Sequence, residues 1–214
     1  MDEPSSALPA ARGRHAPPPE VRLPLQRERL LRAAALEFAE RGYAGTSSES
    51  ISRRAAMSKA TFYEHFANKE ECMLALFDLA RRVVQEAMAT AAGQAPEGDA
   101  RERMRAGTRA FLTALSEHPE FAQTLLVEII GAGPRAAQRR DMILQAFADV
   151  LDAENAAAAR RGLIGRFGSP HDPFAVVGAI TELVSRQVRL GVPEDVLDLA
   201  PVIDRLILGL LPPS

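Results

Sequence analysis

The chain has 214 residues, of which 47% are hydrophobic and 25% are charged, and its formal net charge is −2. These values are typical of a globular protein and exclude a wholly disordered or strongly basic chain. The single cysteine, Cys72, excludes an internal disulfide framework. No apolar run reaches the roughly 18 residues that a membrane span requires. We therefore expect a soluble, cytoplasmic protein with a small domain and a larger one.

The first segment, residues 1–24, is rich in proline, alanine and serine and is expected to form a mobile arm. It is also basic, through Arg12, Arg14, His15 and Arg22. Two interpretations remain open: an arm that touches the backbone or minor groove of DNA, and a solvated leader.

The rest of the chain has helical periodicity and contains no convincing strand pattern. Predicted helices cover residues 26–41, 48–55, 58–66, 69 to a break at 93–98, 100–117, 119–131, 135–162, 173–190 and 194–211. The predicted fold class is all-α. We expect a three-helix helix-turn-helix domain over residues 25–72, followed by a larger helical domain for ligand binding and dimerisation over residues 73–214.

Three polar segments predict where helices begin. Thr46 to Glu49 has the pattern of a capping box, in which the Thr46 hydroxyl accepts an amide and Glu49 reaches back. Ser58 is expected to cap the third helix, and Asn68 the fourth.

The segments 48–55 and 58–66 have the lengths and tight connection of a helix-turn-helix. Phe62 and Phe66 share one face of the second of these helices, where they are expected to pack on Phe38 and Ile51. The alternative is an ordinary helical hairpin with a solvated charged face.

The opposite face of that helix predicts a DNA-binding surface. Ala60, Thr61 and Glu64 would face the bases of the major groove. The expected backbone contacts are Lys59, Tyr63, His65 and Lys69, together with Thr46, Ser47 and Ser58 near the helix starts. Lys59 and Lys69 are the only two lysines in the chain.

Residues 25–80 resemble the DNA-binding region of the tetracycline-repressor (TetR) family. The resemblance is carried by Arg27 to Leu31, Phe38 to Tyr43, Thr46-Ser47 and the segment from Ser58 to Glu70. It implies a homodimer of helical subunits that binds a palindromic operator and represses transcription until a small ligand binds. In that family, the residues that match Tyr63, His65 and Lys69 commonly contact the phosphate backbone.

Two positions depart from the family pattern. Ala56 stands where the family usually has a turn glycine, and a positive φ there would cost about 1 kcal/mol. Phe62 replaces the usual leucine, and this larger side chain could tilt the recognition helix.

A ligand pocket in the larger domain is predicted from one face of the helix at 119–131. That face combines apolar side chains with Glu128, which would suit an amphipathic, cationic ligand. The candidate lining residues are Met104, Phe111, Leu115, Phe121, Leu125, Glu128 and Phe147. The alternative is a core face in which Glu128 pairs with Arg105 or Arg109.

The predicted helix at 173–190 is apolar over a wide arc, and the one at 194–211 is apolar almost all round, so the latter must be covered on two sides. We expect them to form a two-fold dimer interface that sets two recognition helices about one DNA turn apart.

The sequence presents no set of nucleophile, base and orienting residue, and its histidines lack the spacing of metal ligands. We expect neither catalysis nor a cofactor. The main hypothesis is a ligand-responsive repressor. The alternatives are a DNA-binding protein of the same fold that is controlled by a protein partner, and a small helical enzyme.

Overall fold

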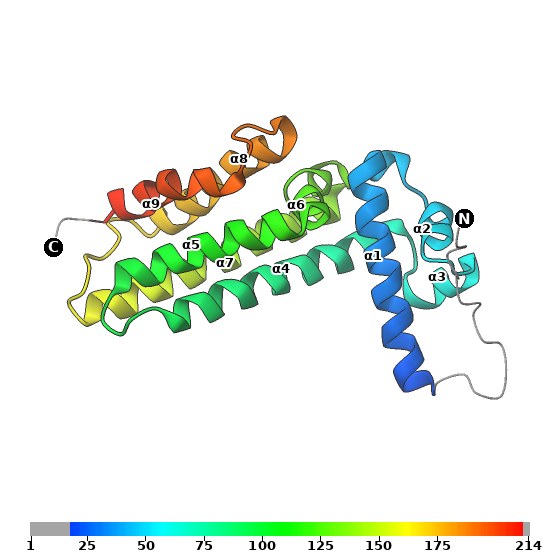
Figure 1. Ribbon diagram of the computed structural model, residues 1–214, viewed down its shortest axis with the longest axis horizontal. Coiled ribbons are helices and arrows are strands. Elements are labelled where there is room, and N and C mark those ends of the chain that lie inside the picture. The colour runs from blue at the N-terminus through cyan, green and yellow to red at the C-terminus, as the bar shows by residue number, and fades with distance from the viewer. Residues whose placement is uncertain (1–17, 212–214) are drawn as a thin grey trace, which may run out of the picture.

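The computed structural model describes residues 18–211, which form nine α-helices and two 3₁₀ helices and contain no strand. Helices α1, α2 and α3 gather at one end of the molecule (Figure 1). From there α4 runs into a bundle with α5 and α7, and α8 and α9 lie along one side of this bundle. The all-α prediction, with helix-turn-helix first and larger helical part second, is confirmed. Within the described residues, no helix is both long and apolar enough to cross a membrane.

The elements follow the predicted order closely. Their bounds are α1 Pro19–Gly45, α2 Ser48–Arg54, α3 Lys59–His65, α4 Lys69–Gln94, α5 Ala100–Glu117, α6 Pro119–Leu126, η1 Glu128–Gly131, α7 Pro134–Arg160, α8 Asp172–Leu190, η2 Val196–Leu199 and α9 Ala200–Gly209.

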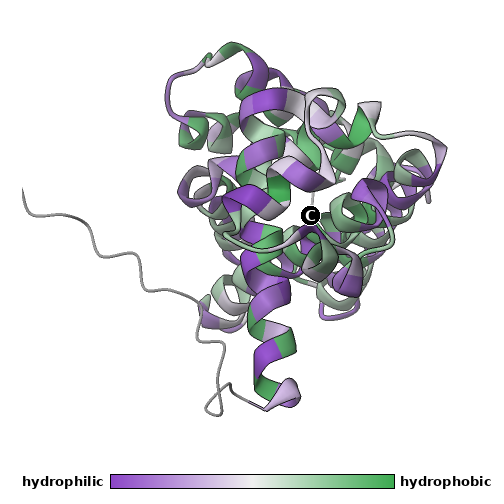
Figure 2. Cartoon of the chain, turned by 90° about the vertical axis from the view of Figure 1, so that its right-hand side faces the viewer, coloured by the Kyte–Doolittle hydropathy of each residue, from purple (hydrophilic) through white to green (hydrophobic). Residues whose placement is uncertain are grey.

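Helix α1 begins at Pro19, several residues earlier than the predicted start at residue 26. Proline is favoured at the first position of a helix because its missing N–H has no acceptor there anyway. Pro24 lies inside the helix, where it lacks the N–H that would donate to Glu20 O. Residues 19–24 therefore belong to the helix and not to the arm, whereas residues 1–17 lie outside the described part. The first turns of α1 project away from the rest of the molecule (Figure 2).

The end of α1 is interrupted at Gly42, which has φ 69° and ψ 167°. This region of backbone conformation is essentially restricted to glycine. The predicted helix end at Gly42 is therefore a true break, and residues 43–45 form a further turn on a new axis.

The predicted capping box at Thr46 is wrong by one residue. Ser47 is the N-cap of α2, its hydroxyl accepts from the Ser50 N–H at 3.1 Å, and the Ser50 hydroxyl accepts from the Ser47 N–H at 3.1 Å. Glu49 does not take part. The caps at Ser58 and Asn68 are confirmed, because their side chains accept from Thr61 N–H and Glu71 N–H.

Two predicted helices are each divided in two. The helix expected over 119–131 ends at Leu126, because Val127 has φ −119° and leaves the helical path before η1 begins. The helix expected over 194–211 is the 3₁₀ turn η2 followed by α9. Asp195 caps η2 by accepting from Leu197 N–H at 2.8 Å, and a proline opens α9.

Two large cores hold the molecule together. The first contains Phe38, Ile51, Phe62 and Phe66, as predicted, and extends without a gap to Ile129 of η1. The second joins α5, α6, α8 and α9. Because Ile129 of η1 belongs to the core of α1, α2 and α3, the two parts of the chain share a packed boundary.

Candidate DNA-binding surface and ligand cavity

The turn between α2 and α3 is built around Ala56, which has φ 51°. The Ala56 N–H donates to Arg53 O at 3.1 Å and the Met57 N–H donates to Ser52 O at 2.9 Å. These two bonds form a Schellman motif, in which the left-handed position is usually glycine. Ala56 therefore takes the positive φ of the usual glycine, so the turn keeps its shape and bears the strain.

Helix α3 presents one face to the core and the other to solvent. Phe62 and Phe66 are 0% and 4% exposed, and their ring centres lie 5.5 Å apart. The opposite face exposes Lys59, Ala60, Tyr63 and Glu64. The larger Phe62 side chain is thus fully accommodated by the core, and the exposed face has the residues that the sequence analysis assigned to DNA.

The start of α3 joins Ser58 and Thr61. The Ser58 hydroxyl accepts from Thr61 N–H at 3.0 Å and lies 2.9 Å from the Thr61 hydroxyl. Thr61 is only half-exposed, so its hydroxyl and methyl groups are held in one orientation beside the exposed face of the helix.

His65 is half-buried at the end of α3, and its Nε2 lies 3.4 Å from Gln26 Oε1. Burial lowers the pKa of His65, and the nearby Arg27 guanidinium lowers it further. Arg27 also donates to His65 O at 3.2 Å and lies 4.5 Å from the centre of the Phe66 ring. Burial and the Arg27 charge therefore favour the neutral imidazole, which Glu64 partly opposes.

Thr46 does not present its side chain to DNA. It is 3% exposed, and its hydroxyl donates to Glu37 O at 3.0 Å and to Gly42 O at 2.8 Å. Its hydroxyl closes the end of α1, which explains why the neighbouring Ser47 becomes the cap. Ser47 itself is exposed.

Lys69 is half-buried rather than free in solvent. Its Nζ donates to Tyr43 O at 2.7 Å and to Thr46 O at 2.9 Å, and lies 4.2 Å from the centre of the Tyr43 ring. Burial lowers the pKa of Lys69. Two of its three donors are therefore used inside the protein, between the end of α1 and the start of α4.

Two arginines that the sequence analysis did not single out brace the reading helices. Arg29 donates to Ala55 O at 2.9 Å, at the end of α2. Arg54 binds Glu37 Oε1 at 2.8 Å and also Glu40. The first contact places a cation at a helix C-terminus, where the helix dipole favours it.

A cavity of about 730 Å³ lies in the larger part of the chain and is lined by α4 to α9. Along α4 its lining runs from Phe77 to Ala92, a stretch of about 22 Å at 1.5 Å per residue. Most of the lining is apolar. The cavity thus has the length and the surface for an elongated apolar molecule.

Five of the seven predicted pocket residues line this cavity: Met104, Phe111, Leu115, Leu125 and Phe147. Phe121 and Glu128 do not. Phe121 packs instead beside the first core, with its ring centre 5.2 Å from that of His118. Glu128 turns away because α6 ends before it, and it accepts from Tyr43 N–H at 2.7 Å and Gln123 Nε2 at 2.9 Å. It pairs with neither Arg105 nor Arg109.

The charged lining residues are mainly arginines, which sequence reasoning missed. Arg81, Arg140 and Arg161 line the cavity, and none has a carboxylate within 4 Å among the residues described. Arg103 is paired with Glu154 at 3.4 Å. The sequence did contain a signal for these arginines. Arg140 of α7 and Arg161, the C-cap of that helix, flank the apolar stripe that contains Phe147 and Leu151. This lining disfavours the cationic ligand expected from the sequence, because arginine side chains repel a cation.

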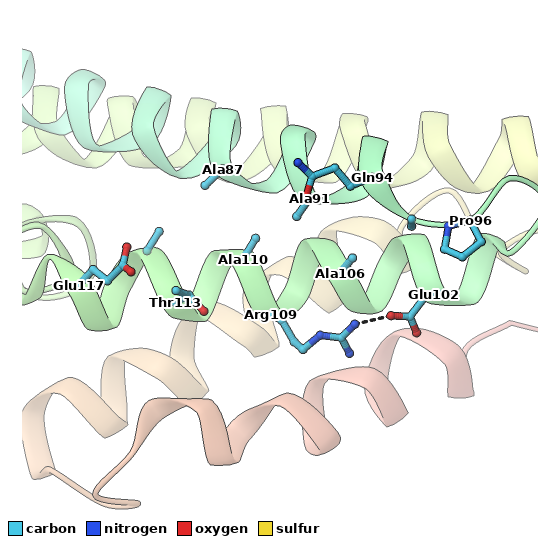
Figure 3. Close-up of a pocket in the computed structure, with 12 residues that line it drawn as sticks. Ala87, Ala91, Gln94, Pro96, Glu102, Ala106, Arg109, Ala110, Thr113 and Glu117 are labelled. Carbon is cyan, nitrogen blue, oxygen red and sulfur yellow. Dashed lines mark hydrogen bonds and ion pairs between the residues drawn. The ribbon is translucent and has the colours of Figure 1, made fainter.

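A second, shallower groove of about 460 Å³ lies between α4 and α5. Half of its lining residues are alanines, and Ala87 and Ala91 of α4 face Ala106 and Ala110 of α5 (Figure 3). Arg109 is paired with Glu102 on the same helix, α5 (Figure 3). These small side chains let the two helices pack closely, and we assign the groove no ligand.

Cys72 is fully buried, and burial raises the pKa of its thiol to about 12. Such a thiol is a poor nucleophile and a poor metal ligand. Across residues 18–211, no group of three or more His, Cys, Asp or Glu side chains is placed to hold a metal ion.

The exposed face of α3, the capped turn before it and the core behind it define a helix-turn-helix DNA-binding protein. Residues 30–76 match the model of the bacterial regulatory proteins of the tetR family. The HTH-type transcriptional activator FasR of Mycolicibacterium smegmatis is 35% identical over 109 residues, which cover 48% of this chain and 46% of FasR. The matched part thus spans about half the length of that relative.

Solved structures share the fold over most of the chain. The fatty acid degradation regulator FadR from Bacillus halodurans has a TM-score of 0.77 at 20% identity, covering 86% of this chain and 95% of FadR. FadR from Bacillus subtilis in complex with stearoyl-CoA has a TM-score of 0.74 at 19% identity, covering 85% and 97%. Residues 30–76 thus match a tetR-family DNA-binding region, and the chain as a whole shares its fold with these solved regulators.

Proposed function

We propose that the protein binds a palindromic operator as a homodimer and that an amphipathic, anionic ligand of the acyl-CoA class releases it from DNA. In this proposal residues 25–72 read the operator, and residues 73–214 bind the ligand and form the dimer. The observation that carries it is the elongated apolar cavity whose charged lining is dominated by arginine.

The DNA-reading role of α3 rests on its exposed face. Ala60, Thr61 and Glu64 are the proposed base contacts, since a small apolar residue, a hydroxyl and a carboxylate can all read base edges in the major groove. Ser47, Ser58, Lys59, Tyr63 and His65 are the proposed phosphate contacts. Lys69 contributes mainly by holding the end of α1. Thr46 is not a proposed DNA contact, because its side chain is buried.

The ligand class rests on the match between cavity and acyl-CoA chemistry. An acyl chain would occupy the apolar length of the cavity, while phosphates would be attracted by Arg81, Arg140 and Arg161. FadR of Bacillus subtilis, which has the same fold, is described with stearoyl-CoA. The alternative of control by a protein partner alone would leave a cavity of about 730 Å³ without a role.

The dimer interface is proposed on α8 and α9, whose outer surface exposes apolar side chains. Phe174 is 42% exposed and Val202 is 40% exposed, although Val176, Val184 and Ile203 of the same helices are already buried in the core. A helix that is apolar on both sides must be covered twice. In a sedimentation experiment, Val202→Asp is expected to convert dimer to monomer.

The ligand proposal is tested with palmitoyl-CoA as the probe and an operator selected from random DNA. We expect palmitoyl-CoA to raise the melting temperature by several degrees and to release the labelled operator, whereas coenzyme A alone does neither. Arg140→Gln should weaken palmitoyl-CoA binding about ten-fold.

The matched control is Arg139→Gln, one residue away on α7. Arg139 pairs with Asp78 at 3.3 Å and does not line the cavity. Equal losses for the two variants would show that net charge, and not the cavity, determines binding. A cationic amphiphile that binds more tightly than palmitoyl-CoA would exclude the proposed ligand class.

A further inference from the structure

We infer that Glu128 couples the ligand cavity to the DNA-reading helices, acting as a positioning residue for the end of α1. This inference rests on the proposed function, because it states how the ligand in the cavity changes operator affinity. The coupling contact consists of Gln123, Glu128 and Tyr43, and we call it the Glu128 latch.

The latch is made possible by the break at Gly42. Its backbone conformation turns the Tyr43 N–H out of the α1 helix, where it donates to Glu128 Oε2 at 2.7 Å. The other carboxylate oxygen, Oε1, accepts from Gln123 Nε2 at 2.9 Å. A Cβ atom on Gly42 would lie 3.3 Å from Glu128 Oε2, so glycine also makes room for the carboxylate.

On one side, the latch is joined directly to the cavity wall. Leu125 and Leu126 line the cavity, and Glu128 follows them by two residues. Ile129, next to Glu128, is fully buried in the core that contains Phe38. A ligand that displaces the end of α6 must therefore either move this buried turn or break the contact to Tyr43.

On the other side, the latch is joined to the start of α4 and to the core on which α3 packs. Tyr43 O accepts from Lys69 Nζ at 2.7 Å, and the Tyr43 ring stacks on Phe38 with centres 5.8 Å apart. Lys69 begins α4 directly after the α3 connection. Tyr43 is thus held by Glu128 through its N–H and by Lys69 through its carbonyl, and both partners fix the pose of α2 and α3.

A second polar link crosses the same boundary and provides a matched comparison. Arg135 of α7 pairs with Glu70 at 3.2 Å and with Glu71 at 2.7 Å, both at the start of α4. The Arg135 side chain is 56% exposed, so solvent and salt screen these pairs. The Glu128 bond is charge-assisted and partly buried, which makes it the stronger constraint.

The experiment measures the operator affinity of the wild-type chain and of the variants Glu128→Ala, Glu128→Gln and Arg135→Gln, each with and without palmitoyl-CoA. The temperature is chosen so that circular dichroism shows all four proteins folded. Without ligand, Glu128→Ala is expected to lose about ten-fold in affinity, or about 1.4 kcal/mol. Arg135→Gln should stay within two-fold. Glu128→Gln should recover part of the loss, because its amide oxygen still accepts from the Tyr43 N–H.

The change in operator affinity on adding palmitoyl-CoA then measures the coupling between the cavity and the DNA-binding surface. Thermodynamic linkage requires ligand and operator to weaken each other by one common factor. We expect this factor to be at least ten for the wild-type chain and below two for Glu128→Ala, with direct palmitoyl-CoA binding unchanged within two-fold.

The outcomes separate this inference from the proposed function. If Glu128→Ala retains the wild-type coupling factor, or binds operator as tightly as wild type without ligand, the latch is wrong. If the wild-type chain does not respond to palmitoyl-CoA, the proposed ligand class is wrong. In that case the ligand-free affinity of Glu128→Ala still decides whether Glu128 positions the reading helices.

Discussion

The ammonium of Lys69 lies 2.7 Å from the carbonyl oxygen of Tyr43 and 4.2 Å from the centre of the Tyr43 ring. The same Nζ donates to Thr46 O at 2.9 Å. A lysine assigned by its position to the DNA backbone thus also closes the end of α1. The other lysine of the chain, Lys59, is exposed at the start of α3.

Substitution of these two lysines is expected to change the salt dependence of operator binding to different extents. Lys59→Gln should weaken operator binding and reduce the slope of log K against log salt by about 0.9, the value for one released phosphate contact. Lys69→Gln should weaken binding while leaving the slope nearly unchanged, and it should also lower the melting temperature. Fluorescence anisotropy titrations at several salt concentrations measure both slopes.

The melting temperature serves as the control for this pair, since the Lys59 side chain forms no ion pair with any residue in the described range 18–211. Equal reductions in slope for both variants would mean that Lys69 leaves its carbonyl partners and contacts phosphate directly.

Thr61 is expected to determine sequence preference rather than overall affinity. Its hydroxyl lies 2.9 Å from the Ser58 hydroxyl, which holds the side chain beside the exposed face of α3. Thr61→Ala should change the preferred base at one position of each half-site, with a loss of about ten-fold on the original operator. Thr61→Ser, which keeps the hydroxyl, should retain more of the preference. Selection from random DNA that returns one motif for all three proteins would exclude this role.

Ala56 is the position where a substitution should stabilise the protein. Its φ of 51° costs a residue with a Cβ about 1–2 kcal/mol. Glycine removes this strain but loses about 0.4–1 kcal/mol through the greater freedom of its unfolded state. Ala56→Gly should therefore raise the free energy of unfolding by about 0.5–1 kcal/mol, measured by urea denaturation. Ala55→Gly, at a helical position in the same turn, is the control and should destabilise.

The helix-turn-helix could be predicted from the sequence because its signals are local. The four-residue spacing of Phe62 and Phe66 fixes the buried face of α3, and Ser58 fixes its start. The cap of α2 was misplaced because Thr46 and Ser47 are chemically similar. Only the tertiary contacts of the Thr46 hydroxyl with Glu37 O and Gly42 O decide between them.

The larger helical part of the chain was predicted less well, because its cavity is assembled from residues that are distant in sequence. Apolar periodicity correctly placed Leu125 and Phe147 on inward faces, but it could not show that α6 ends before Glu128. The direction of Glu128 depends on the backbone at Val127 and on a partner N–H 85 residues away. No local pattern contains that information.

Cys72 is expected to resist alkylation in the folded protein. Its side chain is fully buried and its thiol has a pKa of about 12, so almost no reactive thiolate forms at pH 8. Iodoacetamide should modify the chain only after unfolding in guanidinium, which mass spectrometry detects. A cysteine introduced at exposed Ala67 is the control and should react at once. Rapid modification of Cys72 under native conditions would show that the first core opens readily.

His65 should make the stability of the protein sensitive to pH below neutrality. Burial lowers its pKa in the folded state below the unfolded value of 6.5, and the charge of Arg27 acts in the same direction, although Glu64 opposes it. Well above pH 6.5 the imidazole is neutral in both states and contributes no pH dependence. As the pH falls, the unfolded chain binds the proton more readily than the folded chain, so stability decreases.

His65→Gln removes this proton linkage while retaining a side chain that can bond to Gln26. The melting temperature of the wild-type chain should therefore fall more steeply than that of His65→Gln between pH 7 and pH 5, and the two should run parallel between pH 7 and pH 8. His118→Gln is the control, because that histidine lies outside the DNA-reading helices. Parallel curves over the whole range would mean that His65 is protonated equally easily in the folded and unfolded states.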